Sequence, residues 1–300
     1  MVNGILNTYK EKGYTSHDVV AKMRGILKMK KIGHTGTLDP EAEGVLPICI
    51  GKGTKLVDIL TDKDKTYEAV LKLGIITDTQ DMTGQILKTC EVTVEFPEIE
   101  AAIKKYIGEY DQLPPMYSAI KVNGRKLYEL ARQGKEVERE TRKVSIHDIK
   151  ILDYSAADHE VRMSVDCGKG TYIRTLLHDI GITLGCGGTM KSLIRTRVGA
   201  FSSEDSLRLS EIEELVQSDR LSGYIIPVDE MFPDYGQIII YEEYDKLIHN
   251  GNQFRKEHIK EITREKWEPF VRVYDSEGEF VGIYRFHPEE DSFRAVKMFL

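Results

Sequence analysis

Apolar and polar residues alternate over several stretches of the chain, which is the pattern of half-buried β-strands. Residues 67–73 and 161–167 alternate without interruption, and each stretch predicts one strand. Residues 144–146 and 149–151 show the same alternation with a shift between them, which predicts one strand with a slip or bulge. Residues 45–50 form a continuous apolar run after a polar, glycine-rich segment, so we expect this run to be buried.

Other stretches carry apolar residues three or four positions apart, as one face of a helix requires. This spacing predicts helices over residues 18–27, from 97 to about 110, over 127–131 and from about 172 to 184. Pro97 suits the first turn of its helix, and Gly185 follows the last helix as helix-ending glycines do. Strands and helices do not alternate regularly, so we predict an α+β fold around a mixed or antiparallel central sheet.

The chain changes character near residues 233–236. Beyond this point it holds one short helical stretch, 244–249, and a hairpin-turn sequence at 275–278. The strand-like runs of this tail are short and cover residues 238–240, 270–274, 280–284 and 295–300. We therefore predict two domains, residues 1–232 and a small β-barrel formed by residues 233–300.

Composition excludes several classes of protein. Of the 300 residues, 41% are hydrophobic and 30% are charged, which supports a folded core and argues against disorder. No apolar run approaches the ~20 residues that span a bilayer, and the N-terminus lacks the basic-then-apolar layout of a signal peptide. These features predict a cytoplasmic protein with no membrane partner.

The four cysteines are not arranged as metal ligands or redox pairs. They are Cys49, Cys90, Cys167 and Cys186, with no C-x-x-C pair and no zinc-like spacing to a histidine. Cys49 and Cys167 stand among apolar residues, which predicts buried thiols. We expect no disulfide, no metal site and no cofactor.

The formal net charge of −7 argues against a polyanionic partner, but the distribution of charge matters more than the sum. Residues 121–143 contain eight Lys or Arg and four Glu. Lys191, Arg195 and Arg197 form a second cluster in the sequence. These clusters predict one cationic face on an otherwise acidic molecule. The other interpretation of the 121–143 segment is a charged helix face that only meets solvent.

Residues 33–54 read GHTGTLDPEAEGVLPICIGKGT and hold the strongest candidate for chemistry. Asp39 lies among glycines that permit sharp bends, and Pro40 favours extended backbone angles at Asp39. One carboxylate in a shaped loop before a buried run is how a scaffold presents a catalytic group. An Asp-Pro pair is also a common turn starter, in which the side chain bonds nearby backbone amides.

The same segment closely resembles the first motif of the bacterial TruB family, the tRNA pseudouridine-55 synthases. The match runs through Gly-His-Thr-Gly, Leu-Asp-Pro and Gly-Val-Leu-Pro-Ile without a gap. Residues 65–69 (KTYEA), 112–119 (QLPPMYSA) and 170–176 (GTYIRTL) resemble later motifs of the family in the same order. The resemblance is strong from about residue 3 to about residue 202 and only compositional beyond.

The resemblance implies the pseudouridine synthase fold, a long sheet with a cleft across its middle, followed by a PUA-like RNA-binding domain. A tail that only buttresses the catalytic domain is the other interpretation of residues 233–300. The implied reaction isomerises uridine-55 in the T-arm of tRNA, with base flipping and without a cofactor. The implied partner is tRNA, and we expect a monomer with no obligatory protein partner.

The resemblance also assigns roles to individual residues. It implies that Asp39 is the nucleophile and that Arg174 is its cationic neighbour, within ion-pair reach across one cleft. Tyr67 should stack on the extracted base at the same cleft. Without the family match, Arg174 reads as a surface arginine on a helix and Tyr67 as a half-buried strand residue.

Three further residues complete the implied substrate-binding set. Tyr172 should line the base pocket, and Leu193 should form an apolar wall for the base. His34 should pack against nucleotides pulled from the T-loop, although a structural loop histidine is the simpler interpretation.

A non-catalytic module that binds RNA or helps tRNA to fold is the main alternative function. It would explain the basic segments and the tail, but it would not require Asp39. The GKGT run at residues 51–54 does not form a phosphate-binding P-loop, because Gly53 stands where Ser or Thr must follow Lys52.

Overall fold

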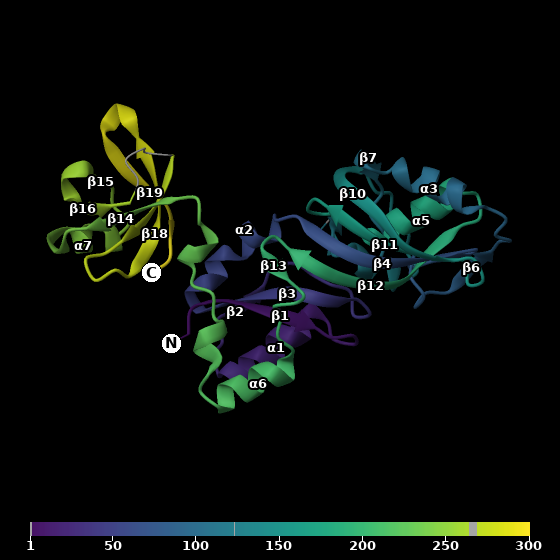
Figure 1. The fold of residues 1–300 in the computed structure, drawn as a ribbon, viewed down its shortest axis with the longest axis horizontal. Helices are drawn as coiled ribbons and strands as arrows, with labels where there is room; N and C mark the ends of the chain where they lie inside the picture. The colour runs from purple at the N-terminus through teal and green to yellow at the C-terminus, as the bar shows by residue number, and fades with distance from the viewer. Residues whose placement is uncertain (1, 123, 264–268) are drawn as a thin grey trace.

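Two β-sheets, one of nine strands and one of six, organise the part of the chain that the computed structural model describes, residues 2–122, 124–263 and 269–300 (Figure 1). The six-stranded sheet lies at one end of the elongated molecule. The described residues include no helix that is both long enough and apolar enough to cross a membrane.

The larger sheet mixes parallel and antiparallel pairs, as expected. Its main path is β1 (Gly4–Lys10), β3 (Glu43–Ile50), β12 (Gly188–Val198), β4 (Lys65–Leu73), β11 (Glu160–Cys167), β10 (Arg142–Ser155) and β7 (Gly108–Gln112), with β2 (Ile32–His34) on β3 and β13 (Phe201–Ser202) on β12. β3 and β12 run parallel. Gly44 allows their close approach, because a Cβ atom there would lie 2.2 Å from the main-chain oxygen of Arg195.

The predicted strands of this sheet are confirmed. β4 and β11 alternate buried and less buried residues, and Val45–Ile50 is buried along its whole length. β10 contains the predicted irregularity, a register shift between Ile146 and Asp148. Cys49 and Cys167 are buried, as predicted.

Two helices cover one face of the sheet toward the β10–β7 edge. α3 (Phe96–Lys104) and α5 (Ile173–Thr183) bury Ile99, Ile103, Leu176 and Ile180 against β4 and β11. The prediction that the helix starting at Pro97 reaches about residue 110 is wrong. The chain leaves the helix after Lys104, Gly108 takes a φ of +108°, and Tyr110 becomes part of β7.

A second helical layer packs on the opposite part of the sheet. α1 (Ser16–Leu27) and α6 (Leu209–Gln217) lie side by side against β1 and β3 (Figure 1). The Thr15 hydroxyl caps α1 by accepting a hydrogen bond from the Asp18 amide at 3.0 Å, and the Asp18 carboxylate accepts the Thr15 amide at 2.8 Å. This reciprocal cap fixes the first turn of α1.

The remaining elements of the first 232 residues are short. They are η1 (Gly51–Leu56), α2 (Val57–Thr61), β5 (Ile75–Thr77), β6 (Ile86–Thr89), β8 (Lys121–Val122), β9 (Arg125–Lys126), α4 (Leu127–Ala131), η2 (Leu221–Tyr224) and η3 (Asp229–Met231). α4 confirms the helix predicted over residues 127–131.

The smaller sheet is barrel-like and encloses its own core. Its strands follow the order β15 (Phe254–Arg255), β19 (Ser292–Met298), β18 (Phe280–His287), β17 (Phe270–Tyr274), β14 (Gly236–Ile240) and β16 (Ile259–Ile262), and its short helices are η4 (Glu242–Tyr244), α7 (Asp245–His249), η5 (Lys256–His258) and η6 (Pro288–Glu290). The predicted hairpin turn joins β17 to β18, where the Gly278 amide donates to the Asp275 oxygen at 3.0 Å.

The two sheets share a hydrophobic cluster where they meet. Phe232 and Phe299 pack in one cluster with Ile5, Val45 and Leu56 of the first sheet region. The Lys55 ammonium donates to the main-chain oxygens of Met298 and Leu300, each at 3.0 Å. The tail therefore rests on the first sheet through both apolar packing and hydrogen bonds.

Candidate active site

The loop between β2 and β3 carries Asp39 and is anchored from several sides. The Ser16 hydroxyl at the start of α1 accepts the Leu38 amide at 2.9 Å. The Lys10 ammonium, at the end of β1, donates to the Pro40 oxygen at 3.1 Å. Lys10 is buried, and burial lowers its pKa to about 8. The residues on both sides of Asp39 are thus held in place, while the Asp39 side chain stays 37% exposed.

Arg174, in the first turn of α5, meets Asp39 through two of its nitrogens. Nε lies 2.9 Å from Oδ2 of Asp39, and Nη2 lies 3.3 Å from Oδ1. The two residues are 135 positions apart in the sequence, and the structure brings them together as expected. Such a bidentate ion pair fixes the orientation of the carboxylate as well as its distance from the guanidinium.

The other nitrogen–hydrogen groups of Arg174 are also used. Nη1 donates to the Thr79 oxygen and Nη2 to the Tyr117 oxygen, each at 3.0 Å. Nη1 also lies 3.5 Å from Oδ2 of Asp81, and the Arg174 side chain is only 5% exposed. The arginine is therefore a buried, fully bonded cation whose outer edge is presented to Asp39.

Two opposing effects act on the Asp39 carboxyl. Burial raises the pKa of Asp39 above its ordinary value, and the Arg174 guanidinium opposes that rise. The carboxylate of Asp81 adds to the rise, because two negative charges share one cation. Ionised Asp39 thus depends on Arg174 remaining in place.

Tyr67 lies on β4 at the base of the same region. Its side chain is buried, and it belongs to one apolar cluster with Leu38 of the Asp39 loop and with Leu193. Burial raises the pKa of the Tyr67 hydroxyl, and the positive charge of Arg195 opposes this rise. Arg195 faces Tyr67 across the β4–β12 register and donates to the Val45 oxygen at 2.7 Å.

The second basic cluster predicted from the sequence does not form a cationic surface. Arg195 is 1% exposed and points into the protein. Lys191 pairs with Glu160 at 2.6 Å, and Arg197 pairs with Asp166 at 2.8 Å. Register shifts in β12, between Met190 and Ser192 and between Arg195 and Arg197, interrupt the alternation of the strand, so Lys191 and Arg197 do not share the inward side of Arg195. Counter-ions on β11 neutralise the two outward charges, so proximity in sequence was misleading.

Tyr172 lies two residues before Arg174, and Leu193 belongs to the apolar cluster that contains Leu38 and Tyr67. Tyr172 precedes α5, and its main chain is locked to the Gln112 side chain by two hydrogen bonds of 2.8 and 2.9 Å. Burial raises the pKa of the Tyr172 hydroxyl. Leu193 is buried on β12 opposite Ala69 of β4.

His34 ends β2 at the entrance of the Asp39 loop and is half-buried. Its Nδ1 accepts the Gly36 amide at 3.4 Å. Its ring meets the ring of His17 edge to face, with centroids 5.3 Å apart. Burial lowers the pKa of His34, and the neighbouring His17 lowers it further.

Sequence reasoning did not assign Asp81 or Arg195 to this site, but the structure places both residues there. Asp81 stands in the turn after β5, where Oδ1 accepts the Thr83 amide at 3.0 Å while Oδ2 faces Arg174. Arg195 was assigned to a surface. No periodicity or spacing in the sequence connects the turn that holds Asp81 to Arg174.

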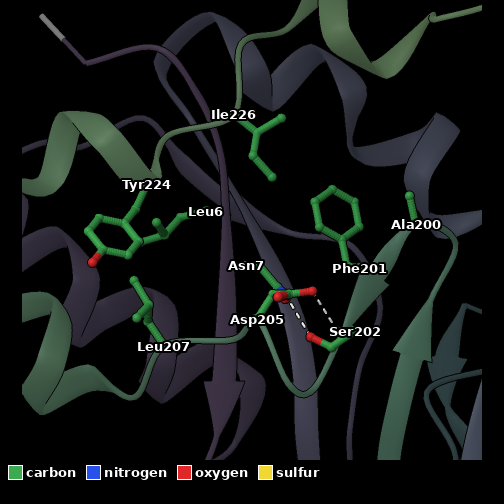
Figure 2. Close-up of a pocket in the computed structure, with 9 residues that line it drawn as sticks. All are labelled: Leu6, Asn7, Ala200, Phe201, Ser202, Asp205, Leu207, Tyr224 and Ile226. Atoms are coloured by element: carbon green, nitrogen blue, oxygen red, sulfur yellow. Dashed lines mark hydrogen bonds between the residues drawn. The ribbon is translucent and has the colours of Figure 1, made fainter.

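A cavity of about 250 Å³ lies elsewhere, between β1, β13 and the segment after η2 (Figure 2). Its walls are Leu6, Asn7, Ala200, Phe201, Ser202, Asp205, Leu207, Tyr224 and Ile226. The side-chain amide of Asn7 donates to the main-chain oxygen of Ser202 at 2.8 Å, and the Ser202 hydroxyl donates to the Asp205 carboxylate at 2.8 Å. These bonds close the turn after β13, and none of the predicted site residues lines the cavity.

The described residues contain no group of three or more His, Cys, Asp or Glu side chains that could hold a metal ion. The chemistry available at the site is that of one oriented carboxylate, a buried guanidinium, a buried phenol and an apolar floor. Such a set suits covalent or acid–base catalysis on a planar substrate that can stack.

Two family models match the chain. One, described as TruB family pseudouridylate synthase (N-terminal domain), matches residues 24–173, and the other, described as tRNA pseudouridylate synthase B C-terminal domain, matches residues 174–233. Both the Asp39 loop and the first residue of α5 lie within the first match.

Named relatives are similar over their full length. A protein named tRNA pseudouridine synthase B from Lachnoclostridium phytofermentans is 54% identical, with 100% of each chain covered. One of the same name from Clostridium novyi is 46% identical over 94% of this chain and 95% of the relative.

Solved structures agree with this relationship. The chain is similar to one in the crystal structure of a Cbf5-Nop10-Gar1 complex, with a TM-score of 0.71 and 26% identity over 99% of this chain and 85% of that one. A chain in the structure of an H/ACA RNP bound to a substrate RNA containing 2'-deoxyuridine gives a TM-score of 0.70 and 25% identity, with the same shares covered. The family models, the relatives and the fold together establish that the chain belongs to the TruB family of pseudouridylate synthases.

Proposed function

We propose that this protein isomerises uridine-55 in the T-loop of tRNA to pseudouridine, with Asp39 as the nucleophile. The observation that carries the proposal is the Asp39 carboxylate held by two nitrogens of the buried Arg174. The relatives named tRNA pseudouridine synthase B support tRNA as the substrate.

The reaction breaks the bond between N1 of uracil and C1′ of ribose, turns the base, and joins C5 to C1′. The C5 proton leaves and N1 gains a proton, so no oxidant, reductant or external group is consumed. A carboxylate can form and release a covalent adduct during this rearrangement. Arg174 would keep Asp39 ionised and aimed while water is excluded by the RNA.

The target base lies inside a folded loop and must be flipped out to reach Asp39. Tyr67, Leu193 and Tyr172 would receive it, with Tyr67 stacking on the base and its hydroxyl near C5. The buried apolar cluster that joins Tyr67, Leu193 and Leu38 supports this placement. His34 would pack against neighbouring nucleotides of the loop.

We also propose that the chain divides into a catalytic domain of residues 1–232 and an RNA-binding domain of residues 233–300. The separate hydrophobic core of the smaller sheet supports the division. RNA binding at the junction is supported by four lysines where the two sheets meet, Lys31, Lys52 and Lys55 from the first domain and Lys297 from the second. Burial lowers the pKa of Lys55, and the other three lysines lower it further, so the four like charges lie close together. Such a cluster suits the phosphates of RNA.

The segment of residues 121–143 offers a second RNA contact. Lys126 and Arg132 both lie over the Tyr128 ring, each 5.4 Å from its centroid. Other charges of the segment are already paired, as in Arg139 with Glu136 at 3.4 Å. Cations beside an aromatic ring suit a folded RNA loop, which is recognised by backbone and stacking contacts.

Some cationic side chains of the smaller sheet are engaged within the protein and are not available to bind RNA phosphates. Arg272 turns inward and donates to the Tyr235 oxygen at 3.1 Å, and Lys256 pairs with Asp291 at 2.6 Å. Arg264 and Lys266, two further cations of the tail that could contact RNA, lie outside the described residues. The proposed contact with tRNA therefore centres on the lysines between the sheets.

Incubating the purified protein with unmodified tRNA tests the proposed function. Mass spectrometry after carbodiimide labelling should detect one pseudouridine, in the T-loop. Binding of tRNA without any modification would favour the alternative, a non-catalytic RNA-binding or tRNA-folding module.

Exchanging Lys52 and Lys297 for alanine should weaken tRNA binding without slowing chemistry. KM for tRNA should rise by about an order of magnitude, and the slope of log affinity against log salt should fall by about 2. kcat at saturating tRNA should stay close to wild type. Lys150→Ala, at an exposed lysine of β10, is the control.

Steady-state kinetics and filter binding at several salt concentrations measure these effects. An unchanged KM and salt slope would remove the lysine cluster from the RNA interface. Deleting residues 233–300 is a poorer test, because it would uncover Phe232 and its apolar neighbours and so destabilise the first domain.

Activity should not depend on a bound transition metal or on a redox cofactor. The proposed chemistry uses only side chains of the protein, so EDTA should reduce turnover no further than magnesium removal alters the tRNA fold. Assays with and without EDTA, with magnesium restored afterwards, measure this. Recovery of chelated enzyme by zinc alone would contradict the proposal.

A further inference from the structure

We propose that His17 is a positioning residue that sets the ring of His34 for its contact with nucleotides of the T-loop. The inference rests on the proposed function, in which His34 packs against RNA. It adds a residue of α1 to the RNA-binding machinery, although His17 lies outside every family motif found in the sequence.

The contact between the two histidines is direct. Their ring centroids lie 5.3 Å apart at an interplanar angle of 75°, an edge-to-face arrangement that aromatic rings favour. His34 is also held at Nδ1 by the Gly36 amide at 3.4 Å. One ring contact and one hydrogen bond together restrict the rotation of the His34 side chain.

The backbone beneath His17 is rigid relative to the Asp39 loop. His17 lies in the first turn of α1, which Thr15 and Asp18 cap reciprocally. The preceding residue, Ser16, accepts the Leu38 amide at 2.9 Å. A shift of His17 would therefore be resisted by contacts that lead directly to the residue before Asp39.

The burial of the two rings is consistent with His34 as the RNA contact and His17 as the residue that positions it. His34 is half-buried, whereas His17 is exposed on the surface of α1. Burial and the nearby His17 both lower the pKa of His34, so its ring stays neutral near pH 7 and loses little hydration when a base stacks on it. His17 supports the ring from the side without covering it.

Substitution of His17 separates a ring contact from a general effect on the fold. His17→Asn removes the aromatic ring and should raise KM for tRNA about three- to tenfold, the range expected for losing one aromatic pair, with kcat nearly unchanged. His17→Phe keeps a ring edge at this position and should recover most of the loss. His159→Asn is the matched control, at a partly buried histidine in a left-handed turn that asparagine accepts.

A double-mutant cycle with His34→Asn supplies the decisive readout. If His17 acts through His34, then His17→Asn should have almost no further effect on kcat/KM in the His34→Asn background. Equal losses in both backgrounds, or no loss in either, would overturn the inference. Wild-type turnover in the same assay reports the proposed function separately, and thermal unfolding of each variant detects a purely structural effect.

Discussion

Asp39→Asn should abolish pseudouridine formation while tRNA binding remains largely intact. Asparagine has nearly the same shape, and its side-chain oxygen can still accept from Arg174, so the loop should keep its conformation. The amide is no nucleophile, and losing a nucleophile typically costs at least about 10⁴-fold in kcat. Binding should persist because it comes from phosphate and stacking contacts.

Single-turnover assays with excess enzyme and filter binding measure the two effects separately. Asp62→Asn is the control, because it makes the same exchange in an exposed pair with Lys169 at 2.8 Å. Substantial turnover by Asp39→Asn would show that another group performs the covalent step.

Arg174→Lys should damage both activity and stability. A lysine ammonium cannot reproduce the two contacts to Asp39 together with the bonds to the Thr79 and Tyr117 oxygens. The two main-chain oxygens and the Asp81 carboxylate would lose partners. Each of these groups that is left without a partner costs about 1–3 kcal/mol of folding free energy, and we expect turnover to fall by at least about 100-fold.

Arg197→Lys provides the comparison for this experiment. Arg197 also pairs with an aspartate, Asp166, at 2.8 Å, but the two side chains are 38% and 36% exposed. Exposed pairs contribute about 0–1 kcal/mol, so this variant should unfold at nearly the wild-type denaturant concentration. Chemical unfolding measures the stability of both variants, and kcat measures their activity. Wild-type behaviour of Arg174→Lys would mean that the guanidinium geometry is unimportant.

Local patterns in the sequence predicted most of the secondary structure. The alternation in residues 67–73 and 161–167 and the shift after Ile146 all correspond to observed strands and an observed register change. The helix predicted to reach about residue 110 ends at Lys104. Tyr106 and Tyr110 fitted the helical spacing, but they do not belong to the apolar face of this helix. They pack against the core from the segment after the helix and from β7.

The candidate site was predicted only where the family resemblance reached. No periodicity relates Asp39 to Arg174, and the resemblance alone placed them in one cleft. Arg195 shows the limit of charge patterns, since the sequence reveals a cation on a strand but not the side it faces. Its buried position follows from the pairing of β12 with β3 and β4, which only the folded chain defines.

The most direct test of the central claim is a position-resolved map of pseudouridine in an unmodified tRNA transcript after incubation with the purified protein. The account predicts complete conversion at uridine-55, no other modified uridine, and no conversion when Asp39→Asn replaces the wild-type protein. Modification at a different position, or conversion at uridine-55 that survives Asp39→Asn, would contradict it.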